Sequence, residues 1–395
     1  MLTAAQNERL TRVGPGTPCG ELLRRYWQAL CPAAELTAQK PKKRIRIMGE
    51  DLVAFRTAEG AYGCVAERCL HRGASLYLGF VEPDGIRCCY HGWKYGFDGG
   101  CLERPFEQDA PKDHVRITAY PVQECGGLLF AYMGPDPARA PLLPHWDVLV
   151  REDRPKKIII FPVHDCNWLQ VQENTVDSVH TYYLHGHYSA VNDLPAVNGW
   201  EYFYRPIQSY DFAVCDWGIE KTLVYGGDKP EIEVRPPLIF PNILRIPQGP
   251  VECIHFRVPI DDTHTRIIWI GLFPPNALPP EPPGMVPFEY TPNNVTPDGE
   301  IDMTNFYGQD RAVWETQGAI FDRSNEMLGK SDRGIAMFRR MLAEQIDLVE
   351  RGEDPTVAVV RDPAKNTLIA FASHTQPWYP DGPGDVHHLL AAAKR

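Results

Sequence analysis

The most informative pattern in the chain lies between residues 69 and 93. It begins with Cys69-Leu70-His71-Arg72-Gly73-Ala74-Ser75-Leu76 and ends with Cys88-Cys89-Tyr90-His91-Gly92-Trp93. The pattern is C-x-H, a spacer of 16 residues and then C-x-x-H. We expect each half to form a tight loop. Two such loops side by side would offer two thiolates and two imidazoles to one metal centre.

Two kinds of centre use this donor set. A tetrahedral Cys₂His₂ site binds zinc, whereas a Rieske 2Fe–2S centre has two cysteines on one iron and two histidines on the other. The spacing favours the Rieske centre, because each loop supplies one cysteine and one histidine, whereas a zinc finger carries its histidines together on a helix. We therefore predict that Cys69, His71, Cys88 and His91 bind a 2Fe–2S cluster.

The flanking residues fit loops wrapped around a cluster. Gly73 and Gly92 allow the backbone to approach closely, and Arg72, Trp93 and Tyr95 are placed to pack over the loops. The adjacent Cys89 is out of register for C-x-x-H and is left out of the ligand set. The cysteines at positions 64 and 101 are predicted to be small buried hydrophobic residues.

A second group of polar residues lies in residues 170–187, which we expect to form one helix. Asn174, Asp177 and His180 are three residues apart and so share one face. His185 is about 140° from His180 on an ideal helix, so binding of one metal by both requires the helix to distort or end there. Two histidines and one carboxylate form a site for non-haem iron. The carboxylate is either Asp177 or a distant residue.

Composition excludes several classes of protein. The 395 residues carry a formal net charge of −11, which argues against binding to a phosphate backbone. No apolar run approaches the length of about 20 residues that spans a bilayer, and the N-terminus has no apolar signal core, so we expect a cytoplasmic protein without membrane contact. In such a compartment the 11 cysteines point to metal binding or burial rather than to disulfides.

Local patterns predict both helices and strands. Thr3 and Gln6 form a capping box for a first helix, and residues 19–30 have a helical apolar period. Short strands are expected at 44–47 and 52–55, and further strands at 201–224, 238–246 and 251–272. The nine prolines of residues 274–297 predict a long loop or a cover over the sheet.

Helix is expected again over 305–349, with an interruption near 329–332 where Ser331 caps the second part. The charged residues 152–157 separate two apolar regions and mark the predicted domain boundary. We divide the chain into an N-terminal helical segment (1–40), a 2Fe–2S domain (41–153) and a mononuclear iron domain (154–395).

The first pattern resembles the Rieske motif of ring-hydroxylating non-haem iron oxygenases. The run from Arg12 to Trp27, together with Asp322-Arg323-Ser324 and Leu328-Gly329-Lys330-Ser331-Asp332, resembles the oxygenase (alpha) subunits of the phthalate 4,5-dioxygenase type. The resemblance covers most of the chain. It implies an α+β fold, with a Rieske domain of antiparallel strands and a helix-grip-like catalytic domain whose antiparallel sheet is flanked by helices.

The resemblance also implies a ligand set for the second metal. In such oxygenases a helix carries Asp, then His, then His, and the third ligand is a much later Asp. Gln309-Asp310-Arg311-Ala312-Val313-Trp314-Glu315 is similar to that later segment, so His180, His185 and Asp310 are the expected ligands. Asp302, Glu315 and Asp322 are rivals for the carboxylate.

The resemblance gives Asp177 the role of a bridge. It would hydrogen-bond a Rieske histidine of a neighbouring subunit and a ligand histidine, and carry electrons across the interface. Asn174 is expected to hydrogen-bond near the site. His164 and His187 are expected to be surface or hydrogen-bonded polar residues rather than ligands.

The implied activity is that of a terminal oxygenase, with a Rieske 2Fe–2S cluster, a mononuclear non-haem Fe(II) and O₂ as co-substrate. It would hydroxylate a small aromatic substrate, with an aromatic acid expected, or act as an O-demethylase or a diaryl-ether-cleaving oxygenase. The implied partners are an NAD(P)H-dependent reductase with flavin and ferredoxin-type centres, and copies of the same chain in a trimer or a pair of trimers. A G-x-G-x-x-G loop in a strand–helix context is absent, so the nicotinamide site is expected on another protein.

Two other classes stay open from the residues alone: a non-catalytic Rieske electron carrier and a zinc hydrolase.

One feature of this sequence departs from the phthalate type of oxygenase. Its pocket needs cations for two carboxylates, and the expected pocket-lining residues 210–214 contain no arginine. Lys221, Arg235 and Arg245 are possible anion partners whose position the sequence does not give.

Overall fold

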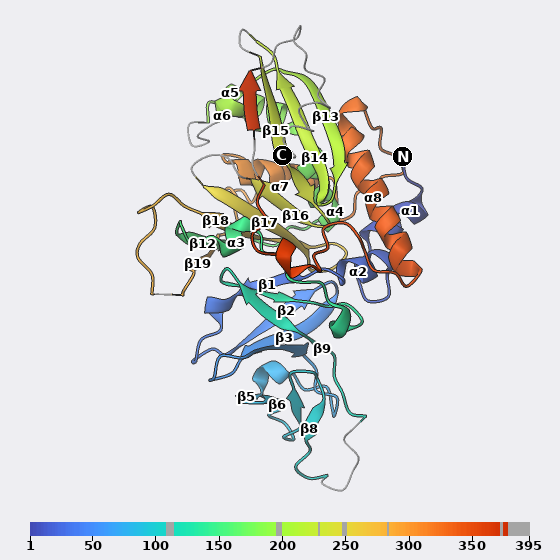
Figure 1. The fold of residues 1–395 in the computed structure, drawn as a ribbon, viewed down its shortest axis with the longest axis vertical. Helices are drawn as coiled ribbons and strands as arrows, with labels where there is room; N and C mark the ends of the chain where they lie inside the picture. Colours follow the sequence, from blue (N-terminus) through green and yellow to red (C-terminus); the bar gives the residue numbers. More distant parts are fainter. Residues whose placement is uncertain are drawn as a thin grey trace.

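The computed structural model describes residues 1–107, 114–194, 200–227, 230–246, 251–282, 284–371 and 374–377. Antiparallel sheets with flanking helices confirm the predicted α+β class (Figure 1). Small sheets form one end of the molecule and a single large sheet forms the other (Figure 1). Among the described residues, no helix has the length and apolar character needed to cross a membrane.

Two four-stranded antiparallel sheets surround the first cysteine–histidine pattern. The first has the order β2-β3-β4-β9, built from Lys42–Ile47, Glu50–Arg56, Tyr62–Ala66 and Ala119–Tyr120. The second has the order β5-β6-β7-β8, built from Phe80–Glu82, Gly85–Arg87, Lys94–Gly96 and Cys101–Glu103. The strands predicted at 44–47 and 52–55 are confirmed as β2 and β3. The central strand β3 is buried from Leu52 to Phe55, as a strand covered on both faces should be.

A third sheet, in the order β1-β11-β10, joins these sheets to the rest of the molecule. It consists of Gln28–Pro32, Leu128–Ala131 and Val122–Cys125. The prediction of a helix over residues 19–30 is therefore wrong in its second half: helix α2 (Pro18–Leu23) ends early and strand β1 follows. Every residue of β1 is buried against β11 and the core, and this tertiary pairing overrides the local helical period. The segment 1–40, predicted as helical, thus contains a strand.

The large sheet has nine strands in the described part of the chain, and β12 and β19 form its one parallel pair. Its path is β13-β14-β15-β16-β17-β18-β12-β19, with β20 paired to β15. The strands are Ile207–Cys215, Gly218–Tyr225, Glu231–Ile239, Ile243–Ile246, Glu252–Pro259, Thr265–Leu272, Lys156–Ile160, Phe288–Tyr290 and His374–Pro377. Strands lie in each window predicted after residue 200, but helix α6 (Trp200–Phe203) occupies the start of the first window, and β15 begins at Glu231, before the predicted residue 238. In its described residues the proline-rich segment is a loop with one short edge strand, β19, which itself contains no proline.

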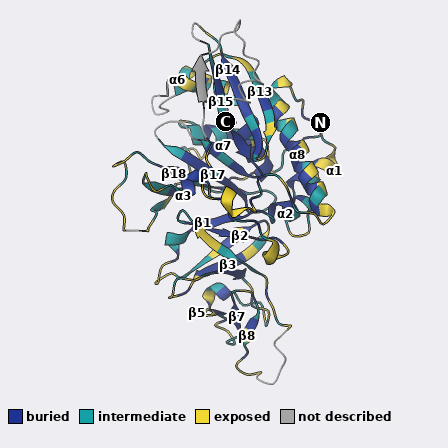
Figure 2. Ribbon diagram, in the orientation of Figure 1, coloured by how far each residue is buried: buried dark blue, intermediate teal, exposed yellow. Residues whose placement is uncertain are grey.

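The helices flank this sheet (Figures 1 and 2). Helix α1 (Ala4–Thr11) begins with the predicted capping box of Thr3 and Gln6. The remaining α-helices are α3 (Asp147–Val150), α4 (Trp168–Glu173), α5 (Tyr188–Val191), α6 (Trp200–Phe203), α7 (Phe306–Thr316) and α8 (Arg333–Glu350). Short 3₁₀ turns occupy Ala33–Glu35, Leu76–Leu78, Pro137–Arg139, Asn174–Val176, Lys330–Asp332 and Pro363–Lys365, and a π-helix occupies Thr181–His187.

Two helix predictions need correction. Residues 170–187 do not form one helix but pass from α4 through a 3₁₀ turn to the π-helix. The second prediction, a helix over 305–349 interrupted near 329–332, overlooked the longer non-helical stretch from residue 318 to 329. Ser331 does not cap α8: the turn Lys330–Asp332 precedes that helix, and the Asp332 carboxylate accepts the N–H of Gly329 at 2.7 Å.

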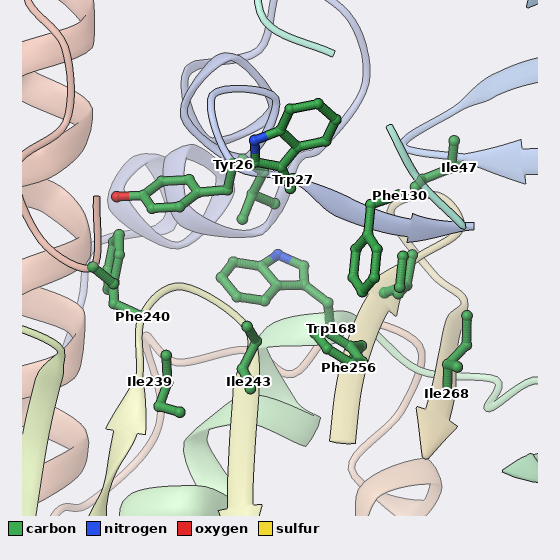
Figure 3. Close-up of a cluster of buried hydrophobic side chains, with 14 of the residues drawn as sticks. Tyr26, Trp27, Ile47, Phe130, Trp168, Ile239, Phe240, Ile243, Phe256 and Ile268 are labelled. Atoms are coloured by element: carbon green, nitrogen blue, oxygen red, sulfur yellow. The ribbon is translucent and has the colours of Figure 1, made fainter. Parts of the chain in front are cut away.

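A continuous aromatic core holds the two ends of the molecule together (Figure 3). Trp168 at the start of α4 is fully buried and lies between the N-terminal elements and the large sheet (Figure 3). Tyr26 packs edge-on against Phe240 at 5.7 Å between ring centroids, and Phe130 packs against Phe256 at 5.2 Å. Because α4 is fixed in this core, the residues that follow it have a defined position.

Candidate metal centres

The two cysteine–histidine loops have the same backbone construction. In the first loop Gly73 donates its N–H to the carbonyl of Cys69 at 2.8 Å, and in the second Gly92 donates to Cys88 at 3.1 Å. Both glycines have positive φ, +71° and +76°, which a side chain would disfavour. In each loop the cysteine N–H closes the turn by donating to a carbonyl five residues on, that of Ala74 or Trp93.

These loops bring the four predicted cluster residues together. The His71 and His91 rings lie 4.5 Å apart, and Trp93 stacks on His71 at 4.8 Å. Both cysteines are 2% exposed. The Tyr95 hydroxyl lies 3.4 Å from the Cys69 Sγ and fixes the loop by accepting the N–H of Leu70.

The donor set fits a 2Fe–2S cluster. The Nδ1 atom of His71 is buried and has no hydrogen-bond partner among the described residues, as expected of an atom meant for a metal. Burial raises the pKa of the Cys69 thiol, and the neighbouring Cys88 adds to this. This shift does not prevent the binding of iron, because a coordinating thiol is deprotonated by the metal itself.

The second donor set is built from three successive local structures. Helix α4 gives way to a 3₁₀ turn, the chain leaves helical geometry at Asp177 (φ −94°, ψ 94°), and His180 precedes the π-helix. Hydrogen bonds in a π-helix run over five residues, so side chains five apart approach one face more closely than in an α-helix. This distortion brings His180 and His185 together, with 5.3 Å between ring centroids.

Helix α7 supplies the carboxylate from the opposite side. The Asp310 Oδ1 lies 3.7 Å from the His180 Nε2 and 3.4 Å from the His185 Nε2. One ligand atom from each of these three residues lies within 4.8 Å of the others. Two imidazoles and one carboxylate on one side leave open positions toward a cavity, so the residues fit a mononuclear iron.

Side chains around this set orient it. The amide of Asn174 contacts both the His180 Nε2 at 3.2 Å and the Asp310 Oδ1 at 3.3 Å. Gln309 Oε1 lies 2.9 Å from the His185 Nδ1, and its amide donates to the Ser189 hydroxyl at 3.1 Å. Gln309 was missed from the sequence as a functional residue, although it directly precedes Asp310. A polar residue beside a ligand in a buried helix is the signal that could have found it.

Asp177 differs in detail from its expected role. Its carbonyl oxygen lies 2.5 Å from the His180 Nδ1, whereas its carboxylate lies 3.7 Å from that atom, beyond hydrogen-bond distance. The carboxylate instead accepts the N–H groups of Val179 and His180. The chain turns out of the helix at Asp177, and this turn directs the carbonyl toward the imidazole. The other carboxylate oxygen, Oδ2, lies 3.7 Å from the His180 Nδ1, and the Asp177 side chain is 30% exposed.

The charges of the site are mutually stabilising. Burial alone raises the pKa of the Asp310 carboxyl, but His185, His180 and Arg257 outweigh it and hold that pKa below its usual range. Burial alone lowers the pKa of His180, but the nearby Asp177 and Asp310 carboxylates reverse the direction and raise it.

The rival and secondary residues lie elsewhere. Glu315 pairs with Arg311 at 2.8 Å, and Asp322 accepts the backbone N–H of Ser324 at 2.9 Å. Asp302 likewise falls outside the one described group of side chains able to hold a metal. His187 is exposed, as expected. His164 also falls outside that group, but its ring is neither at the surface nor hydrogen-bonded to any described residue: it is fully buried, and its Nδ1 lies 3.7 Å from the Glu315 Oε1.

A cavity of about 340 Å³ opens beside His180, His185 and Asp310. Aromatic side chains line much of it: Phe161, Phe203, Trp269, Phe306, Tyr307 and Trp314. Residues 210–214, which the sequence placed in the pocket, do not line it; Phe212 is turned toward Gly334. The three cations proposed as anion partners, Lys221, Arg235 and Arg245, all line the cavity. His255 and Arg257 line it as well and were not predicted.

Two family models match separate segments of the chain. A Rieske [2Fe-2S] domain model matches residues 26–121, and a model described as LigXa C-terminal domain like matches residues 297–378.

Individual proteins resemble nearly the whole chain. The 5,5'-dehydrodivanillate O-demethylase oxygenase subunit of Sphingobium sp. (strain NBRC 103272 / SYK-6) is 39% identical over 93% of this chain and 86% of its own length. The phthalate 4,5-dioxygenase oxygenase subunit of Pseudomonas putida is 32% identical over 89% of this chain and 88% of its own. A solved structure of the reduced complex between oxygenase and ferredoxin in carbazole 1,9a-dioxygenase shares the fold, with a TM-score of 0.55 at 18% identity, over 86% of this chain and 93% of that one.

Proposed function

The chain belongs to the Rieske non-haem iron oxygenases as an oxygenase (alpha) subunit, and from this premise we propose that it hydroxylates an aromatic acid in the cavity beside His180, His185 and Asp310. It is the terminal oxygenase of a multicomponent system, uses O₂, and works with a separate electron-transfer partner. One observation carries the proposal: a single chain holds both a Cys₂His₂ loop pair and a His₂-carboxylate set at a cavity. A Rieske electron carrier has no use for the second set, and a zinc hydrolase has none for the first.

We assign Cys69, His71, Cys88 and His91 to the cluster, and His180, His185 and Asp310 to the mononuclear iron. When bound, the cluster stores one electron and the iron supplies the chemistry of O₂ activation. The boundaries at residues 41 and 154 remain our division of the chain; the family model for the first domain begins earlier, at residue 26, in line with the pairing of β1 to β11.

The protein's own residues prepare the site. Gln309 and Asn174 hold the imidazoles and the carboxylate in place, which fixes the direction in which the open positions point. The aromatic lining excludes water and is complementary to a flat substrate. The side chains of the cavity wall therefore determine which carbon of the substrate faces the iron.

O-demethylation is the second candidate reaction. It is favoured by the similarity to the 5,5'-dehydrodivanillate O-demethylase oxygenase subunit. Dihydroxylation is favoured by the similarity to the phthalate 4,5-dioxygenase subunit. Cleavage of a diaryl ether is a third outcome of the same attack on a substrate that carries such a bond.

We propose that the chain works as a homotrimer or as a pair of trimers. The cluster loops lie near one end of the molecule and the iron residues in the other half (Figure 1), so a neighbouring copy is needed to bring the two centres together. Large exposed apolar residues surround the cluster loops: Leu70, Leu78, Phe80, Tyr90 and Phe106. We further propose that the electron donor is an NAD(P)H-dependent reductase with flavin and ferredoxin-type centres, whose docking face is basic because this chain is acidic.

A substrate screen tests the reaction. The purified protein, with a compatible reductase and NADH, is offered benzoates, phthalates, methoxybenzoates and phenoxybenzoates while O₂ uptake and products are followed. O₂ uptake coupled to a hydroxylated product is expected with at least one acid, and formaldehyde identifies O-demethylation. Uncoupled or absent uptake across the whole panel would contradict the proposal.

A further inference from the structure

Lys221 is a buried ammonium on the wall of the iron cavity. It lies in strand β14 directly opposite Phe212 of β13 and Arg235 of β15, and only 6% of the residue is exposed. Its Nζ donates to the carbonyl of Thr175 at 2.8 Å. Thr175 follows Asn174, which contacts both His180 and Asp310, so the ammonium is anchored next to a residue that orients the iron set.

Two other cations of the cavity wall already have their counter-ions. Arg245 forms ion pairs with Asp147 at 2.7 Å and with Glu252 at 2.8 Å. Arg235 pairs with the fully buried Glu233 at 3.2 Å. The charge of each guanidinium is thus balanced by a carboxylate of this chain, although the Nε of Arg235 is buried without a hydrogen-bond partner among the described residues.

Lys221 and Arg257 have no such partner. Within the described residues no carboxylate lies within ion-pair distance of either side chain, although both are buried. Arg257 donates to the Val171 carbonyl and to the Thr175 hydroxyl, which are neutral. Asp310 and Glu233 act on these two side chains only at longer range, so a cavity wall with two buried cations and no direct ion pair among the described residues is complementary to an anion.

The charged groups around Lys221 act on its pKa. The groups that face it are Arg235 and Glu233 from β15 and Arg257 from β17, while β13 opposes it with the uncharged Phe212. Burial, together with the like charges of Arg235 and Arg257, lowers the pKa of Lys221 to about 7, and Glu233 only partly offsets them. An incoming anion would reverse this balance and favour the ammonium form.

We propose that Lys221 is the specificity-determining residue that binds the carboxylate of the aromatic substrate, with Arg257 as a second donor. The substrate then enters with its carboxylate against β14 and β17 and its reacting end toward Asp310. This inference rests on the proposed function and deepens it, because it selects acids over neutral aromatic compounds of the same shape. Binding of the acid is coupled to the uptake of one proton by Lys221 above neutral pH.

Binding of acid–amide pairs to the metal-loaded protein tests this without turnover. The probes are benzoate, 4-methoxybenzoate and 3-phenoxybenzoate, each beside its carboxamide, titrated calorimetrically without reductase. We expect at least one acid to bind on the order of 10- to 100-fold more tightly than its amide. Titration at pH 8 in buffers of different ionisation enthalpy should show uptake of nearly one proton for that acid.

Substitutions assign the effect to one side chain. Lys221→Met should reduce acid binding to the level of the amide, abolish proton uptake and leave amide binding unchanged, which also shows that the cavity is intact. Lys221→Arg should keep most of the acid preference but lose the proton uptake, because a guanidinium stays protonated. Lys157→Met is the control: it removes an ammonium that pairs with Glu289 at the surface. It should change neither the preference for the acid over the amide nor the proton uptake.

Three results would overturn the inference. Equal acid binding by the unsubstituted protein and Lys221→Met removes Lys221 from recognition, and loss of acid binding in Arg257→Met alone transfers the role to Arg257. Tighter binding of the amides than of the acids excludes a carboxylate site. Binding of none of the six probes, together with O₂ uptake that no aromatic compound stimulates, would contradict the proposed function itself.

Discussion

Gln309 holds His185 in the orientation that iron binding needs. Its Oε1 lies 2.9 Å from the His185 Nδ1, and its own amide is fixed by the Ser189 hydroxyl and the Met303 carbonyl. The bond keeps the proton on Nδ1 and leaves Nε2 free for a metal. Because Gln309 is neutral, Asp310 remains the one negatively charged residue among the three assigned iron ligands.

Gln309→Leu should lower the affinity for the mononuclear iron roughly 10- to 100-fold, because the imidazole loses its acceptor and its fixed tautomer. The measurement is iron retained after dialysis against a chelator, with the cluster absorbance as internal reference. Gln317→Leu at the exposed end of the same helix is the matched control and should retain iron. Equal retention in both variants would show that Gln309 does not position the ligand.

His180→Ala should remove the mononuclear iron and keep the Rieske spectrum, because the two donor sets share no residue. Iron and sulfide content and the EPR spectrum report both centres on one sample. His187→Ala alters an exposed histidine bonded to the Tyr204 hydroxyl and should keep both centres. Loss of both spectra in His180→Ala would contradict two independent sites.

The residues with strict chemical spacing were the predictable ones. C-x-H and C-x-x-H fix a loop geometry locally, so the sequence brings four donors together without knowledge of the fold. Lys221, Arg257 and His255 meet the iron set only through the register of β14 and β17 in the large sheet. That register depends on contacts far apart in the chain, which single residues do not encode.

A buried ion-pair network fixes the elements around the iron set. Glu173 at the end of α4 pairs with Arg323 at 2.9 Å and with Arg339 of α8 at 2.6 Å, and Arg339 also pairs with Glu326. Arg323 further donates to the Asn7 side chain of α1. Four separate segments thus meet directly beside Asn174.

Arg323→Met should destabilise the protein by about 3–5 kcal/mol, since it leaves the Glu173 carboxylate buried with one partner fewer. Thermal unfolding measures the change. Arg351→Met removes one of an exposed pair, with Glu353, and should change the melting temperature little. Similar melting temperatures for the two variants would contradict a stabilising role for the network.

The ion pairs of Glu173 with Arg323 and Arg339 predict that the free energy of unfolding falls at acid pH. Burial alone raises the pKa of Glu173, but Arg323 and Arg339 outweigh it and hold that pKa below the usual value. A carboxyl group with a lowered pKa in the folded state stabilises the protein above its unfolded pKa, and the stabilisation is lost as the pH falls through the folded value. The stability gap between the unsubstituted protein and Arg323→Met should therefore narrow on acidification below the usual range of a glutamate.

Elements were predictable where local pattern and tertiary environment agree. Strands β2 and β3 and the capped helix α1 follow from local pattern alone. The π-helix at Thr181–His187 does not, although the spacing of His180 and His185 showed that an ideal helix would fail there. The helical period of residues 19–30 was misleading, because burial on both faces suits a strand as well as a helix.

At the scale of the whole molecule, the two donor sets lie in different halves of one chain (Figure 1). Asp177 lies at the surface of the iron half, with its carbonyl near His180 and a carboxylate that is partly exposed. In the trimer that we propose, this carboxylate would meet a cluster histidine of the next copy. Asp177 would then couple the two centres across the interface.

Asp177→Asn should keep both metal centres and the hydrogen bonds that the side chain accepts from the N–H groups of Val179 and His180. Electron transfer from the cluster should become much slower, because an amide carries no negative charge to place between the two imidazoles. Stopped-flow reoxidation of the reduced protein by O₂ in the presence of substrate measures it. Asp211→Asn alters a surface aspartate paired with Arg333 and should reoxidise normally. Normal reoxidation of Asp177→Asn would remove this residue from the path.

The metal content of the purified protein, measured with its EPR spectrum, tests the central claim most directly. A Rieske oxygenase subunit predicts about three iron atoms and about two sulfide ions per chain, with a Rieske-type signal after reduction. Zinc without sulfide, or a 2Fe–2S cluster with no further iron in protein whose His180, His185 and Asp310 are unchanged, would contradict it.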